Sequence, residues 1–317
     1  MTVTGLRVCA HGVPSESWQS HVYGFQITMS SGSLTAPKTT KTPEKNLLVD
    51  WVTGCGESFL SMVQSIGDLA LFAWATITTL FRGLPNRKTL LPNFYQVGVL
   101  SLPVVAITGT FIGMVLAVQS HFQFAQVGLE SRLGAVINMS LVRELGPVLA
   151  AIMLAGRVGS AMAAELGTMR VTEQIDALAS MGANPIRYLV VPRFLACLIL
   201  IPTLVVMADF MGVVGGYFYS VMVVGIDKHQ YMYHSQAFVG GFDLFIGILK
   251  SFFFGSAIAL VSCYRGFHSE PGAEGVGRAA TAAFVYSFVL ILALDLFVGM
   301  FLDTIYLYWN PGGSKLF

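Results

Sequence analysis

The sequence has few charged residues. Of 317 residues, 18 are Lys or Arg and 17 are Asp or Glu, so charged side chains make up 11% of the chain, against about 25% in an ordinary soluble domain. So few charges cannot cover the surface of a water-soluble body of this length. Apolar residues reach 55% and the mean hydropathy is +0.69, which also excludes a disordered chain. The composition predicts a membrane protein.

Common catalytic and ligand-binding motifs are missing as well. The four cysteines (Cys9, Cys55, Cys197 and Cys263) form no CxxC pair, and we interpret them as small apolar side chains. The histidines form no HExxH motif, so we predict no metal ion. No lysine follows a glycine, which excludes a P-loop for ATP. We therefore predict no cofactor in this chain and no enzymatic activity, and a net charge of +1 gives no reason to expect nucleic acid.

The first 45 residues differ from the rest of the chain. They are rich in Ser, Thr, Pro and Gly without apolar periodicity, so we predict a disordered tail over residues 1–45. The tail contains no apolar core of a signal peptide. Two alternatives stay open: a transit peptide, although only Arg7 supplies the expected arginine, and a true start at Met29.

The remaining residues predict an all-α integral membrane protein. Residues 57–82 have the 3/4 apolar spacing of an amphipathic helix, which favours a helix in the membrane interface over a spanning one. Five apolar runs follow, each as long as the roughly 20 residues of a bilayer crossing. These spans are residues 94–118, 133–156, 194–224, 244–264 and 280–306. Small residues at four-residue spacing, such as Gly109 and Gly113, predict close helix packing.

The basic residues between the spans predict the orientation. Nine of them fall on one side of the membrane, and that side is expected to be cytoplasmic. They are Arg82, Arg87, Lys88, Arg157, Arg170, Arg187, Arg193, Arg265 and Arg278. Three fall on the other side: Arg132, Lys228 and Lys315. Residues 157–193 are thus predicted to be cytoplasmic.

That cytoplasmic segment contains a short amphipathic pattern over residues 171–181. Val171, Ile175 and Leu178 share one face, and Glu173 and Asp176 lie on the other. Gly182 can take a left-handed conformation, and Asn184-Pro185 is expected to end the helix. The pattern fits a helix that docks a soluble partner, and it also fits a plain solvated connector.

Several charged residues lie inside the predicted spans, where they are costly and usually functional. Arg143 and Glu144 are adjacent and point about 100° apart on a helix, so each needs a partner from another helix. Lys250 and Asp295 are the natural candidates, with Asp209 as a fifth member. The cluster is either a polar functional site or a charge-balanced structural network.

Five stretches resemble the MlaE/YrbE family of ABC-transporter permeases. The similarity covers roughly residues 57–310 in order. The stretches are residues 143–147 (RELGP), 155–160 (AGRVGS), 165–178 (ELGTMRVTEQIDAL), 185–193 (PIRYLVVPR) and 272–278 (GAEGVGR).

The resemblance implies a permease domain over residues 46–310, with a short C-terminal tail over 311–317. It implies an interfacial helix, five transmembrane helices and a cytoplasmic coupling helix between the second and third spans. The implied function is to move phospholipid between the membranes of a double-membraned envelope, powered by a separate ATPase subunit that binds ATP and Mg. The implied partners are a second copy of the chain, that ATPase and a periplasmic MCE-domain protein. The implied location is the bacterial inner membrane, with the chloroplast inner envelope as the alternative.

The resemblance also implies three groups of site residues. Residues that couple to the ATPase are Glu165, Arg170, Glu173, Gln174 and Asp176. An intramembrane charged cluster contains Arg143, Glu144, Lys250 and Asp295. A lipid cavity at the dimer interface lies near Gln119, Leu145 and Leu149.

Two other classes of function remain as alternatives. The buried charges fit an ion-coupled carrier, although no inverted repeat is visible and five spans do not divide into equal halves. A membrane scaffold without transport activity is the other alternative.

Overall fold

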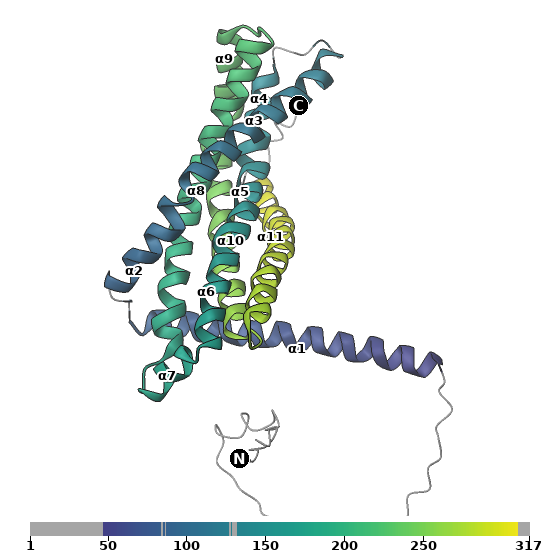
Figure 1. The fold of residues 1–317 in the computed structure, drawn as a ribbon. Coiled ribbons are helices and arrows are strands. Elements are labelled where there is room, and N and C mark those ends of the chain that lie inside the picture. The colour runs from purple at the N-terminus through teal and green to yellow at the C-terminus, as the bar shows by residue number, and fades with distance from the viewer. Residues whose placement is uncertain (1–46, 84, 86, 127, 129–131, 310–317) are drawn as a thin grey trace, which may run out of the picture. The chain divides into compact units, whose positions relative to one another are not determined.

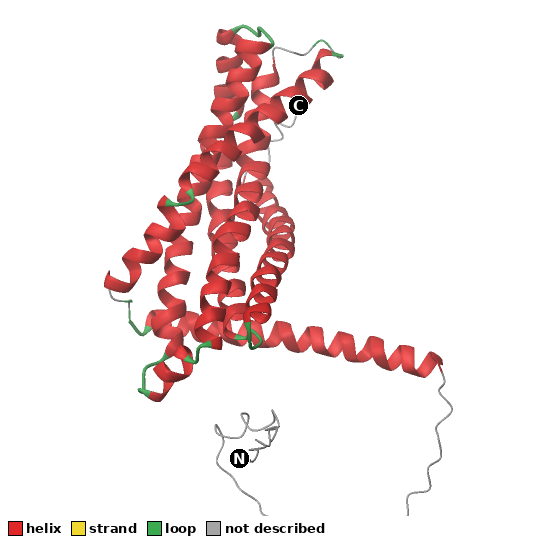
Figure 2. Ribbon diagram, in the orientation of Figure 1, coloured by secondary structure: helices red, strands yellow, loops and turns green. Residues whose placement is uncertain are grey.

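A computed structural model describes residues 47–309 of the protein, apart from 84, 86, 127 and 129–131. Within these residues every regular element is a helix (Figure 2). The chain divides into two compact units at Cys55 and Gly56, and the helical bundle belongs to the second, Gly56–Phe317. The predicted all-α membrane fold is confirmed. The predictions for residues 1–45 and 311–317 lie outside the described residues.

Sixteen helical elements make up the described part of the chain, and Figure 1 labels the α-helices among them. The α-helices are α1 (Leu47–Phe81), α2 (Arg87–Phe94), α3 (Leu102–Ala125), α4 (Leu133–Ser140), α5 (Gly146–Leu154), α6 (Ser160–Val171), α7 (Gln174–Ser180), α8 (Val191–Tyr217), α9 (Lys228–Phe238), α10 (Gly241–Phe267) and α11 (Ala273–Trp309). The π-helical elements are η1 (Tyr95–Val99), η3 (Leu141–Leu145), η4 (Ala155–Gly159), η5 (Ile186–Val190) and η6 (Phe218–Val223).

Six helical stretches of the described chain are long and apolar enough to cross a membrane. They are Val63–Phe81, Arg87–Ala125, Leu133–Val171, Ile186–Val223, Gly241–Phe267 and Ala273–Tyr306. The last five correspond to the predicted spans, and each of them starts at or before the start of its span. The third predicted span, 194–224, ends one residue after its stretch, Ile186–Val223. Hydropathy marks only the hydrocarbon core, whereas the backbone continues as helix through the headgroup region.

The first of the six, in α1, corresponds to the predicted interfacial helix. Its Phe72 packs against the rings of Tyr264 and Phe267 in the last turns of α10, with centroid distances of 5.8 and 5.9 Å. Exposed apolar residues such as Ile66 and Trp74 lie along the same helix. An interfacial placement of α1 stays a prediction.

Small residues let the central helices come into backbone contact, as the sequence predicted. A Cβ atom at Gly113 of α3 would lie only 1.9 Å from the carbonyl oxygen of Gly212 in α8. A Cβ atom at Gly109 would lie 2.6 Å from the carbonyl oxygen of Ala208. Close approach of this kind replaces the hydrophobic effect as a source of stability between helices in lipid.

Prolines help to place the π-helical turns. Pro103, Pro147 and Pro192 each stand in the first turn of an α-helix, two to four residues after the end of a π-helical segment. A proline has no N–H to donate to the carbonyl four residues earlier, which disturbs the regular α-helical ladder at that point. The turn η3, which ends just before Pro147, carries Arg143 and Glu144.

Candidate functional site: a buried ion-pair cluster and an exposed docking helix

Lys250 of α10 is the centre of a buried ion-pair cluster. Its side chain is completely buried, and its Nζ lies 2.6 Å from Glu144 Oε2 of η3 and 3.0 Å from Asp295 Oδ1 of α11. Three separate helical segments therefore meet at one ammonium group. The predicted meeting of Glu144, Lys250 and Asp295 is confirmed.

Arg143 has different partners from those expected. Its guanidinium pairs with Asp303 of α11 and lies 3.7 Å from Asp243 Oδ1 of α10. Its Nε is 3.9 Å from Glu144 Oε1, a long contact that agrees with the divergent directions of adjacent helical residues. The prediction that Lys250 and Asp295 would supply all the partners was wrong for Arg143. The two cations together face four carboxylates.

The predicted cluster included neither Asp303 nor Asp243. The spacing of both residues in the sequence could have indicated that they belong to the cluster. Asp243 precedes Lys250 by seven residues, and Asp303 follows Asp295 by eight, so each pair lies on one face of its helix. Asp243 also accepts a hydrogen bond from the Gly240 backbone N–H at 2.9 Å, which fixes the start of α10.

Asp209 is not part of this cluster, contrary to the prediction. It is 6% exposed on α8 and faces α5, where a Cβ atom at Gly146 would lie 1.8 Å from its Oδ1. Among the described residues it forms no ion pair. Only a glycine at position 146 leaves room for this carboxyl group.

A second group of charged residues surrounds α7, at the end of the bundle predicted to be cytoplasmic. Arg170 Nη1 at the end of α6 lies 2.6 Å from Asp176 Oδ1 of α7. Glu165 Oε1 lies 2.9 Å from Nη2 of Arg193, whose side chain is nearly buried. Glu173, Gln174 and Asp176 are exposed. Three of the five predicted coupling residues are thus exposed at α7 and Arg170 contacts one of them, whereas Glu165 pairs with Arg193.

The helix expected over residues 171–181 is shorter than predicted. Glu173 has a φ of 57°, a left-handed conformation that breaks the chain between α6 and α7. Val171 consequently belongs to α6 and is exposed, so its prediction as part of the apolar face of the docking helix was wrong. Ile175 is buried against Leu166 and Leu189, with Leu178 packed beside it, which anchors α7 to the bundle.

The residues after α7 agree in part with the sequence prediction. Gly182 has a φ of 77°, as expected for a left-handed helix end. Asn184 and Pro185, however, do not end α7, which already stops at Ser180. They stand at the start of the next helical segment, η5. The Oδ1 atom of Asn184 accepts a hydrogen bond from the backbone N–H of Ile186 at 3.0 Å.

Comparison with known proteins identifies the family. The family model described as "Permease MlaE" matches residues 90–301. The chain belongs to the MlaE permease family. A "Probable ABC transporter permease protein" of Rickettsia felis is 42% identical over 246 residues, which cover 78% of this chain and 95% of the relative.

Two other relatives of this MlaE-family chain carry more specific names. The "Intermembrane phospholipid transport system permease protein MlaE" of Haemophilus influenzae is 30% identical over 250 residues, covering 78% of this chain and 96% of that protein. The "Protein TRIGALACTOSYLDIACYLGLYCEROL 1, chloroplastic" of Arabidopsis thaliana is 36% identical over 234 residues, which cover 74% of this chain and 67% of that protein. The resemblance found in the sequence motifs is confirmed.

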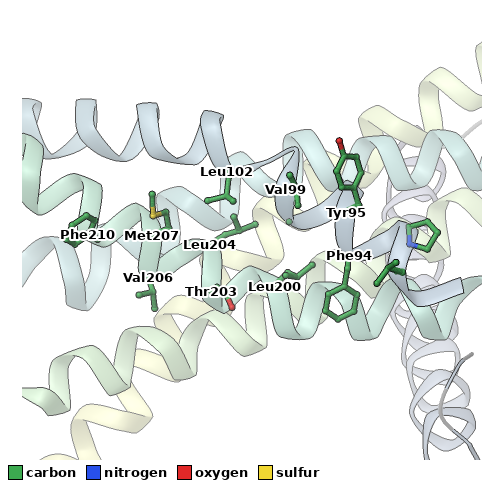
Figure 3. Close-up of a pocket in the computed structure, with 13 residues that line it drawn as sticks. Phe94, Tyr95, Val99, Leu102, Leu200, Thr203, Leu204, Val206, Met207 and Phe210 are labelled. Carbon is green, nitrogen blue, oxygen red and sulfur yellow. The ribbon is translucent and has the colours of Figure 1, made fainter. Parts of the chain in front are cut away.

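The three residues that the family resemblance assigned to a lipid cavity lie on the surface of the single chain. Gln119 of α3, Leu145 of η3 and Leu149 of α5 are all exposed. None of them lines the large apolar groove between the segment Leu91–Leu102 and α8 (Figure 3). Their position on an open surface is compatible with a cavity completed by a second copy, which stays a prediction.

Proposed function

We propose that this MlaE-family permease is the membrane subunit of an ABC-type transporter that moves phospholipid between the two membranes of a double-membraned envelope. ATP and Mg would bind to a separate ATPase subunit. The names of the Rickettsia and Haemophilus relatives support the class of transporter and the class of substrate. In the chain itself, the observation that carries the proposal is α7, a short helix with an anchored apolar side and an exposed polar side.

The geometry around α7 suits the transmission of force from a cytoplasmic ATPase. Ile175 packs in a cluster with Leu166 of α6 and Leu189 of η5, so displacement of α7 would move both neighbouring segments. The Arg170–Asp176 ion pair connects α6 to α7 across the left-handed residue Glu173. The Glu165–Arg193 ion pair connects α6 to α8. We propose that the coupling site consists of five polar residues: Glu165, Arg170, Glu173, Gln174 and Asp176.

The stretch from α4 to α6 connects this end of the bundle to the buried cluster. Leu133–Val171 is one helical stretch that carries Glu144 in its π-turn and Glu165 in α6. Leu145 follows Glu144 directly, so a change at the Glu144–Lys250 pair would move the wall of the proposed lipid cavity. In this proposal the cavity forms between two copies of the chain, near Gln119, Leu145 and Leu149, and opens toward a periplasmic MCE-domain partner. The proposed location is the bacterial inner membrane, with the chloroplast inner envelope as the alternative.

Charge reversal on α7 tests the coupling site. Glu173→Lys combined with Asp176→Lys should abolish co-purification of a P-loop ATPase from native membranes in mild detergent. The permease dimer should remain in the membrane, because both side chains are exposed and do not support the core. Asp68→Lys combined with Glu274→Lys is the matched control, since these side chains are also exposed and lie outside α7. Wild-type amounts of ATPase with the α7 variant would contradict the coupling role.

The same preparation tests the function as a whole. A stable permease from which no ATPase co-purifies in any mild detergent would argue against an ABC-type transporter. Phospholipid transport by that lone protein in vesicles would then support an ion-coupled carrier.

A further inference from the structure

A long apolar groove runs between the start of the second apolar stretch and α8. Its volume is about 990 Å³, at the upper end of the roughly 300–1,000 Å³ typical of small-molecule pockets. Its walls come from two stretches, Leu91–Leu102 and Leu200–Phe210, and Figure 3 labels most of their lining residues. Among the described residues that line it, Thr203 and Tyr95 are the only ones with a polar side-chain group.

The groove has a local cause in the sequence. The π-turn Tyr95–Val99 and the break before Pro103 interrupt the helical ladder between α2 and α3, and interruptions of this kind are the usual sites of helix kinks. Gly98 lies on the groove, where a Cβ atom would be 3.1 Å from Leu200 Cδ2. The two walls thus approach each other at Gly98 and leave an open groove beside it.

A polar pocket adjoins the groove on the same short helix. This second pocket of about 720 Å³ is lined by Lys88 and Thr89 of α2 and, across from them, by Asn184, Arg187 and Tyr188. Lys88 and Pro92 are one helical turn apart on α2, and Pro92 already lines the apolar groove. A Cβ atom at Gly83 would lie 2.7 Å from Nη2 of Arg187, so the guanidinium rests against the turn that precedes α2.

The charges of this polar pocket select an anion. Lys88 and Arg187 are exposed cations, and no acidic residue occurs among the described residues that line either pocket. The pocket lies beside the end of α7, on the side that the basic residues predict to be cytoplasmic. Basic pockets next to membrane helices on that side favour anionic lipid headgroups.

The length of the groove matches one leaflet of the membrane. Ten residues separate Leu200 from Phe210, which corresponds to about 15 Å of helix. The hydrocarbon core of a bilayer is about 30 Å thick. The α8 wall of the groove is therefore about as long as the hydrocarbon part of one leaflet is thick.

We infer that each copy of this chain binds one anionic glycerophospholipid of the cytoplasmic leaflet on its outer surface. The phosphate would lie between Lys88 and Arg187, and an acyl chain would lie in the groove between η1 and α8. This site shares no residue with the cavity proposed near Gln119, Leu145 and Leu149. It requires a membrane but neither an ATPase nor transport, so it can be tested independently of the proposed function.

Native mass spectrometry of the full chain tests the site. The purified protein is exposed to equal amounts of phosphatidylglycerol and phosphatidylcholine, and the lipids retained per chain are counted. The wild type should retain phosphatidylglycerol preferentially. Lys88→Gln with Arg187→Gln should reduce that preference by roughly fivefold for each cation removed. The control variant Arg82→Gln with Arg87→Gln removes two exposed charges that are close to Lys88 in the sequence but do not line the pocket. It should have little effect on the preference for phosphatidylglycerol.

Filling the groove is the second arm of the test. Val206→Trp places a large ring in the groove and should abolish lipid retention, whereas Ile199→Trp changes a similarly exposed residue of α8 outside the groove. Equal retention by the two variants would overturn the inference. Conversion of a dimer to a monomer by Val206→Trp, with lipid retention unchanged, would show instead that a second copy covers the groove.

A third measurement leaves the groove unfilled in case Val206→Trp does not fold. A photoreactive benzoylphenylalanine at Val99, which is 52% exposed in the groove, should crosslink to phosphatidylglycerol in mixed vesicles more often than its share of the vesicle lipid. Crosslinked lipid with the composition of the bulk vesicle would contradict a specific site.

Discussion

Ion pairs occur in two regions of this permease that differ in their access to water. Between η3, α10 and α11, Lys250 is completely buried and contacts both Glu144 and Asp295. At the turn between α10 and α11, Arg278 pairs with Glu270, and both side chains are more than half exposed. The residue types and the contacts are similar, but the surroundings are not.

The difference lies in what remains when one partner is removed. A charge left at the exposed turn is solvated by water, so exposed pairs contribute only about 0–1 kcal/mol. A charge left inside the bundle has no such replacement, and breaking a buried pair costs about 3–5 kcal/mol. Burial, rather than the number of ion pairs, therefore decides which charges this fold depends on.

The largest effect is expected at Lys250. Lys250→Met should lower the free energy of unfolding by about 3–5 kcal/mol, because Glu144 and Asp295 would face each other without a cation. An SDS titration of the purified protein measures this change. A loss below 1 kcal/mol would mean that water solvates the two carboxylates once the cation is gone, and the contrast with the exposed turn would disappear.

Neutralising the whole group sharpens the comparison. The triple variant Lys250→Met, Glu144→Gln, Asp295→Asn removes all three charges together and should recover most of the stability lost by Lys250→Met alone. Phospholipid transfer between vesicles then separates the two interpretations of the cluster. A stable triple variant without transfer indicates a functional polar site, and one with normal transfer indicates a structural network.

An intermediate effect is expected at the Glu165–Arg193 pair, where one partner is buried and the other half-exposed. Glu165→Gln should cost about 1.5–3 kcal/mol, since the Arg193 guanidinium would keep only its bond to the Leu189 carbonyl, at 3.1 Å. Glu274→Gln is the control, because that carboxylate is mostly exposed and lies 3.9 Å from Arg278. Equal unfolding curves for the two variants would show that water reaches Arg193.

The smallest effect is expected at the exposed turn. Arg278→Gln should change the free energy of unfolding by less than about 1 kcal/mol, and the change should shrink further as salt is added. The same SDS titration at low and high ionic strength measures it. A loss comparable to that of Lys250→Met would show that the turn is buried in the assembled protein.

Several features could be read from local patterns in the sequence. The apolar runs located the five helices that extend from Arg87 to Tyr306, because the length of a bilayer crossing is a local property. Gly109 and Gly113 indicated close packing, since small residues four apart form one stripe of a helix. The left-handed Gly182 was also predictable from its place after an amphipathic pattern.

Other features depended on contacts between distant parts of the chain. The break at Glu173 was missed because a non-glycine residue seldom adopts a positive φ, so its sequence carries no signal for one. The position of Asp209 was missed because hydropathy cannot tell which neighbour a buried carboxyl faces. Its neighbour is Gly146, and the charged cluster lies elsewhere.

The sequence by itself determined the class of protein, the number of long apolar helices and the family, because composition, run length and contiguous motifs do not depend on how helices face each other. Only the tertiary structure decided the partners of the buried charges. Lys250 and Glu144 are 106 residues apart, and Arg143 and Asp303 are 160 apart. Which of several buried carboxylates meets which cation is fixed by the rotation of each helix, and packing of the whole bundle sets that rotation.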